Sequence, residues 1–163
     1  MHFSSGLTLL ELLLVVFIAG VLAAIGIPVI GNLIHQQAFN QYSSAVAQNI
    51  SLATTQANSN DQVYALLYSP SGIQWGPTGG TIAQCEGGQP SVAPTIGQIA
   101  APSGISSGTG WLCMSPPGVV SFPTSPAPAT CPYDSTYTFP CIELSGFGIS
   151  RQLIVAVSGQ VKS

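Results

Sequence analysis

One carboxylate lies within the most hydrophobic part of the chain. Residues 7–30 form a run of 24 residues in which Glu11 and Thr8 carry the only polar side chains. An ionised side chain in an apolar environment costs several kcal/mol, and it is tolerated when an opposite charge pairs with it. The chemistry that Glu11 predicts is therefore ion pairing in a dry environment.

Four cysteines form the second set of reactive groups. Cys85, Cys113, Cys131 and Cys141 all lie in the second half of the chain. Their even number predicts disulfides if this part of the chain is exported to an oxidising compartment, and four cysteines allow three pairings. We favour Cys85–Cys113 and Cys131–Cys141, because nearest-neighbour closure suits a loop-rich segment. The alternative is a four-thiolate zinc site, but the chain lacks the C-x-x-C spacing typical of such sites.

Charge is scarce, and its scarcity excludes several function classes. Charged side chains make up only 4% of the 163 residues, and the only basic ones are Arg151 and Lys162. Two cations cannot build the positive surface that nucleic-acid binding needs. Asp134 and Glu143 are too isolated in sequence to predict a calcium site, and neither histidine belongs to a Ser/His/Asp or Cys/His set. We therefore expect no enzyme activity, no metal and no cofactor.

The hydrophobic run predicts a helix as long as a membrane span. A bilayer core of about 30 Å needs about 20 helical residues, whereas a cleaved secretory signal has an apolar region of only about 7–15 residues. Residues 7–30 fit the first description. Pro28 removes a backbone donor, so we expect it to kink or locally melt this helix.

Residues 31–57 are expected to continue the helix with an amphipathic pattern. Apolar residues recur there at spacings of three and four on an otherwise polar helix, which predicts packing against a globular domain. Residues 58–61, rich in Asn and Ser, predict the end of the helix. The apolar stripe comprises Phe39, Tyr42, Val46, Ile50, Ala53 and Ala57.

Residues 58–163 predict a loop-rich β head domain. Twelve of the 13 prolines fall between Pro70 and Pro140, so we expect the middle of the domain to be mostly loop. The fold class predicted is α+β, with a long N-terminal helix, half transmembrane and half amphipathic, packed on a small antiparallel sheet. The predicted strands are residues 62–68, 73–75, 110–114, 119–122, 136–139, 141–144 and 152–157, with a short addition at 160–161.

The start of the hydrophobic run carries a motif. The string GLTLLE at residues 6–11, followed by an apolar helix, resembles the processing site of bacterial type IV pilins and of the related pseudopilins of type II secretion. In that family a prepilin peptidase cuts after the glycine, and the new N-terminal residue is N-methylated. With Leu7 as the first mature residue, Glu11 is the fifth and Pro28 the twenty-second. These are the positions of the family's hallmark glutamate and of a common proline.

The resemblance implies how the chain would be processed and assembled. Residues 1–6 would be a leader peptide, removed after Gly6 by prepilin peptidase, and Leu7 would be methylated. The prepilin would sit in the inner membrane as a single-pass protein. An assembly platform there would polymerise it, through its N-terminal helix, with identical or related subunits. Glu11 would neutralise the freed amine of a neighbouring subunit, and Pro28 belongs to the same assembly helix.

The function expected is that of a structural subunit of a type IV pilus or pilus-like filament, extracellular once assembled. The alternatives are a minor pilin with a binding role at the tip, in adhesion or DNA uptake, and a periplasmic type II secretion pseudopilin. A C-terminal disulfide-bounded loop is frequent in pilins, and a Cys131–Cys141 pair resembles it, which favours a pilus subunit. The shortage of cations argues against DNA as a partner.

Overall fold

The structure, a computed structural model, describes residues 9–124, 127–132 and 138–162, without the side chains of residues 23–30, 132 and 138. The chain divides into two compact units, Met1–Gln37 and Ala38–Ser163. We call the second of these the head unit. The helix α1 (Leu9–Asn60) contributes to both units.

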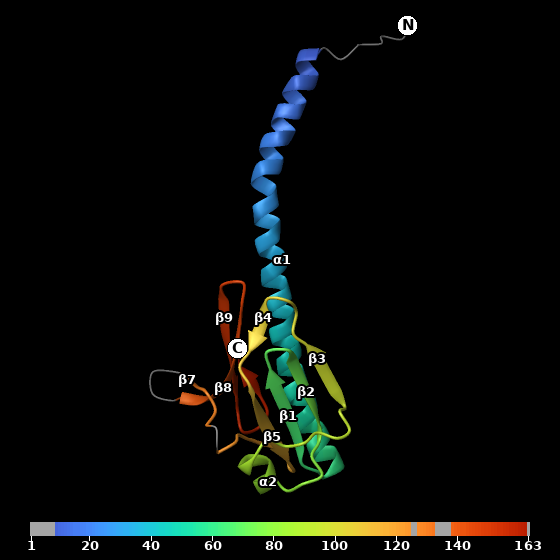
Figure 1. Cartoon of the computed structure of the whole chain (residues 1–163), viewed down its shortest axis with the longest axis vertical. Helices are drawn as coiled ribbons and strands as arrows, with labels where there is room; N and C mark the ends of the chain where they lie inside the picture. The colour runs from blue at the N-terminus through green and yellow to red at the C-terminus, as the bar shows by residue number, and fades with distance from the viewer. Residues whose placement is uncertain (1–8, 125–126, 133–137, 163) are drawn as a thin grey trace. The chain divides into compact units, whose positions relative to one another are not determined.

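The remaining elements all lie in the head unit (Figure 1). They are β1 (Tyr64–Ser69), β2 (Gly72–Pro77), α2 (Ile82–Gly87), β3 (Gly97–Ala100), β4 (Ile105–Ser107), β5 (Gly110–Ser115), β6 (Val119–Ser121), β7 (Thr130–Pro132), β8 (Thr138–Gly146), β9 (Ile149–Val155) and β10 (Val161–Lys162).

The strands form two antiparallel sheets where one small sheet was expected. The first has five strands in the order β3-β2-β1-β5-β6, and the second has the order β10-β9-β8-β4, with β7 paired to β8. A backbone hydrogen bond of 2.7 Å, from the N–H of Val120 to the carbonyl of Val157, connects β6 with the segment after β9. The head unit therefore holds more regular structure than the sequence predicted.

The main core of the head unit lies between α1 and both sheets. All six residues of the predicted stripe are at most 3% exposed, which confirms the amphipathic reading of this part of the helix. Their partners are inward-facing side chains of both sheets, so the α+β fold with a helix packed on antiparallel strands is confirmed. Examples of these partners are Leu66 of β1, Leu112 of β5, Ile142 of β8 and Leu153 of β9.

The first sheet is covered on its other face by α2. Because side chains alternate along a strand, Leu66 faces the main core while its neighbour Ala65 belongs to a second cluster with Cys85, Trp111 and Cys113. Cys85 lies on α2, and the other two lie on β5. The first sheet is therefore the middle layer of three.

The helix and strand boundaries differ from the expected ones in several places. The middle of the domain, expected to be mostly loop, contains α2, β3 and β4. The two strands predicted on either side of Pro140 form the single strand β8. Pro140 is compatible with β8 because its pairing to β9 starts only at Cys141, and a proline is tolerated where a strand has a free edge. The end of α1 at Asn60 agrees with the predicted stop.

Candidate functional site

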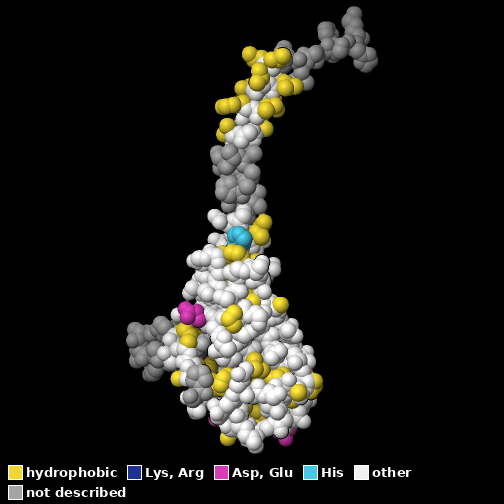
Figure 2. Space-filling model, viewed as in Figure 1, with side chains coloured by type: hydrophobic (Ala, Val, Ile, Leu, Met, Phe, Trp, Pro, Cys, Tyr) yellow, Lys and Arg dark blue, Asp and Glu magenta, His cyan; other side chains and the backbone are white. Residues whose placement is uncertain are grey.

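The first part of α1 has an apolar surface. Within residues 9–22, the large hydrophobic side chains are 46% to 79% exposed, and they occupy nearly consecutive positions, so every side of the helix is apolar. Figure 2 shows these side chains gathered along this stretch. A helix that is hydrophobic on all sides needs an apolar environment or apolar partners. Among the helices that the structure describes, none is both long and apolar enough to cross a membrane.

Glu11 is the only charged residue in this apolar segment, residues 9–22. It lies in the first turn of α1, and its side chain is exposed. A carboxylate in this position interacts favourably with the positive end of the helix dipole. Gly6 and Leu7, the two residues of the expected processing site, lie outside the described residues. The geometry therefore places a single acid at the start of an apolar surface.

The backbone of α1 is helical without interruption through Pro28. The local melting expected there is not found. A proline inside a helix removes only one backbone hydrogen bond. The helical turns before and after Pro28 are unbroken, so the helix continues. The side chain of Pro28 lies outside the described residues.

Both predicted disulfides are present. Cys85 pairs with Cys113 and Cys131 pairs with Cys141, with Cα–Cα distances of 6.0 and 5.8 Å. Because no cysteine is free, the alternative of a four-thiolate zinc site is wrong. Within the described parts of the chain, no group of three or more His, Cys, Asp or Glu side chains is placed to hold a metal ion.

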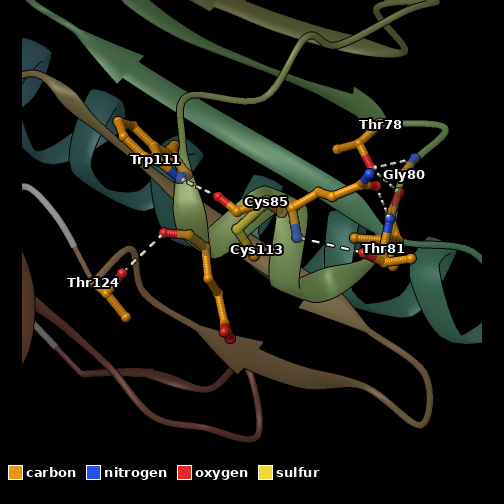
Figure 3. Close-up of a disulfide and its surroundings, with 10 residues drawn as sticks. Thr78, Gly80, Thr81, Cys85, Trp111, Cys113 and Thr124 are labelled. Carbon is orange, nitrogen blue, oxygen red and sulfur yellow. Dashed lines mark hydrogen bonds between the residues drawn. A yellow bond between two sulfur atoms is a disulfide. The ribbon is translucent and has the colours of Figure 1, made fainter.

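The Cys85–Cys113 disulfide is part of a tightly bonded region around α2 (Figure 3). Thr81 caps this helix: its hydroxyl accepts from the N–H of Gln84, and its own N–H donates to the Gln84 side chain. The indole N–H of Trp111 donates to the carbonyl of Cys85 over 2.8 Å. Sequence reasoning missed this helix, although the T-x-x-Q spacing of a capping box was a readable signal.

Arg151 is engaged within the head unit. Arg151 on β9 donates a 3.0 Å hydrogen bond to the Asn40 side chain on α1, and its guanidinium lies 5.9 Å from the centre of the Phe39 ring. Both contacts attach the second sheet to the helix. Arg151 therefore has a structural role in the head unit.

Two tyrosines, Tyr42 and Tyr68, are buried in the head unit. Burial raises the pKa of both Tyr42 and Tyr68 above the ordinary value of 10.0, because desolvation disfavours the phenolate. The Tyr42 hydroxyl has no hydrogen-bond partner among the described residues. Neither group is charged at neutral pH.

These tyrosines predict a loss of stability in alkali. Above pH 10 the unfolded chain releases the phenolic protons while the folded chain keeps them, so the free energy of unfolding falls as pH rises through the raised pKa values. Urea unfolding between pH 7 and 11 measures this fall. A Tyr42→Phe/Tyr68→Phe variant should show a smaller fall. The Tyr42→Phe substitution should not lower the stability at pH 7, because it removes a hydroxyl that has no hydrogen-bond partner in the described part of the chain. An equal alkaline fall in both proteins would contradict this account.

Comparisons of the chain with protein-family models, curated proteins and solved structures gave no match.

Proposed function

We propose that this protein is a structural subunit of a type IV pilus or a pilus-like filament. The observation that carries the proposal is the apolar segment, residues 9–22, with its single acid. Glu11 occupies the fifth position after Gly6, where the pilin family has its glutamate. A helical segment that is apolar on all sides has the surface that the dry interior of a filament requires.

Glu11 would act when a subunit enters the filament. Hydrolysis of the peptide bond between Gly6 and Leu7 leaves a carboxylate on the leader and an amine on Leu7. Inside the filament this amine, as a cation, would be surrounded by apolar side chains. The Glu11 carboxylate of a neighbouring subunit neutralises it, and two buried charges are tolerable only as such a pair. The ion pair therefore selects one register of neighbouring helices.

The head unit would form the outside of the filament. Its two disulfides suit a domain that is exported across the inner membrane into an oxidising compartment. The disulfide-bounded loop between Cys131 and Cys141 favours a pilus subunit over a secretion pseudopilin. The partners in this proposal are other pilin subunits, prepilin peptidase, the inner-membrane assembly platform and the membrane itself.

The processing step gives a direct test of the proposal. Co-expression with a prepilin peptidase should produce a protein that begins with N-methylated Leu7, as determined by mass spectrometry of the intact chain and its N-terminal peptide. Gly6→Val should leave the full-length chain uncut, because the peptidase cuts after a glycine. Gly20→Val is the matched control, since an added Cβ at Gly20 meets no other atom within 4 Å. A chain that stays uncut with Gly6 intact, or is cut elsewhere, would refute the processing model.

A further inference from the structure

The outer face of the first sheet carries a row of side chains that has no role in the filament model. The register aligns Gln98 of β3 with Gln74 of β2, Gln74 with Leu67 of β1, and Leu67 with Trp111 of β5. We call these four residues the outer row. They face away from α1, because their neighbours along the strands, such as Ile73 and Leu66, belong to the main core.

A cavity of about 200 Å³ lies over the outer row. Gln89, from the segment after α2, and Thr109, from the loop before β5, contribute to its lining together with the four row residues. Liquid water occupies about 30 Å³ per molecule, so the cavity has the volume of about six or seven waters. It can hold one small ring.

The two ends of the outer row differ in chemistry. Gln74 and Gln98 are exposed, and each amide offers two donor hydrogens and an acceptor oxygen. At the other end the ring of Trp111 is almost buried, and its N–H is already committed to the carbonyl of Cys85, as Figure 3 shows. Trp111 therefore contributes no polar group to a ligand and only a small exposed surface, so the half-buried Leu67 supplies most of the apolar surface of the cavity.

The lining selects against charged and against purely apolar ligands. No Asp, Glu, Lys, Arg or His is among the described residues that line the cavity, so an ionic ligand would lose its hydration without gaining an opposite charge. An apolar ligand would cover the amides of Gln74, Gln89 and Gln98 and leave them unpaired, which is costly. A neutral ring with several hydroxyl groups and one apolar face meets both conditions.

From this chemistry we propose that the cavity over the outer row is a binding site for a neutral saccharide unit, of the size of one pyranose ring. The glutamine amides exchange hydrogen bonds with its hydroxyl groups, and its C–H face packs against the half-buried Leu67, beside the small exposed part of Trp111. All the residues involved belong to the head unit. The proposal therefore stands independently of filament assembly.

The test uses the full chain in micelles of a zwitterionic detergent, because sugar-based detergents would compete for the site. Glucose, galactose, mannose and N-acetylglucosamine are the neutral probes, and glucosamine and N-acetylneuraminic acid are the charged ones. Saturation-transfer NMR and side-chain amide shifts report binding. We expect at least one neutral probe to bind and to shift glutamine side-chain amide signals, with the charged sugars weaker.

Substitutions locate the binding to the outer row. Gln74→Ala and Gln98→Ala should each weaken the binding by about tenfold, the effect of losing one or two hydrogen bonds. Gln152→Ala is the matched control, because Gln152 is also an exposed strand glutamine but lies on β9 of the second sheet. Unchanged far-UV circular dichroism and an unchanged melting temperature verify folding.

Three results would overturn the proposal. The first is the absence of binding by any neutral probe at about 50 mM, far above a millimolar Kd. The second is binding that is equally affected by Gln152→Ala. The third is a shift of the Gln74 and Gln98 signals with protein concentration alone, which would show that the cavity holds another copy of the chain.

Discussion

Glu11→Ala is expected to give a protein that is processed normally but hardly enters filaments. The substitution leaves the Leu7 amine of a neighbouring subunit buried without its counter-charge. Breaking one side of a buried ion pair costs about 3–5 kcal/mol, which corresponds to a loss of more than about a hundredfold in the equilibrium for adding a subunit. The measurement is the quantity of sheared filaments, by electron microscopy and immunoblotting, in cells without the wild-type subunit.

Three further variants separate the charge of Glu11 from its shape and from general effects. Glu11→Gln keeps the shape and should fail like Glu11→Ala, whereas Glu11→Asp keeps the charge and should assemble in part. Glu143→Ala removes an exposed carboxylate on β8 and should assemble normally. Normal filament yield from Glu11→Ala, with processing verified by mass spectrometry, would contradict the ion-pair model.

Removal of the Cys85–Cys113 disulfide is expected to destabilise the head unit strongly. This bond joins residues 28 apart in sequence, and the chain-entropy model assigns a loop of that length about 3.5 kcal/mol. A single domain has only about 5–15 kcal/mol in total. The Cys85→Ala/Cys113→Ala variant should also release Trp111, whose indole hydrogen bond depends on the position of Cys85.

The shorter disulfide is the matched control. Cys131 and Cys141 are 10 residues apart, so the same model assigns their loop about 2.7 kcal/mol, and Cys131→Ala/Cys141→Ala should leave the Trp111 environment unchanged. Urea unfolding, followed by tryptophan fluorescence and far-UV circular dichroism of the full chain in micelles, measures both losses. A larger loss from the shorter loop would show that loop closure is not the dominant contribution.

Local patterns predicted the helix and the disulfides well. The stripe from Phe39 to Ala57 repeats at the helical period over several turns, and each of its members is buried. The pairing of the cysteines followed from closing the nearest neighbours in a segment rich in proline and glycine. In both cases the information lies within a short stretch of sequence, so no knowledge of the tertiary structure was required.

Long-range pairing could not be predicted in the same way. Leu67 of β1 pairs with Gln74 of the next strand, β2, across a hairpin. On its other edge β1 pairs with β5, where the partner of Leu67 is Trp111, far along the chain. The strand β3, expected to be loop, adds Gln98 to the same row. The alignment of the outer row depends on the register of three pairings, and a slip of one residue would turn each side chain to the opposite face. No sequence pattern in separate segments fixes such a register.

The attachment of Arg151 to Asn40 and Phe39 has a consequence for how copies of the protein meet in solution. Arg151 keeps its charge in these contacts with neutral groups but is held in place beside α1, and the chain carries a net charge of only −3. The electric field around each copy is therefore weak. If the protein forms the filament that we propose, electrostatic repulsion between neighbouring filaments is then weak. Such filaments should associate laterally into bundles by short-range contacts alone, and added salt should hardly loosen them.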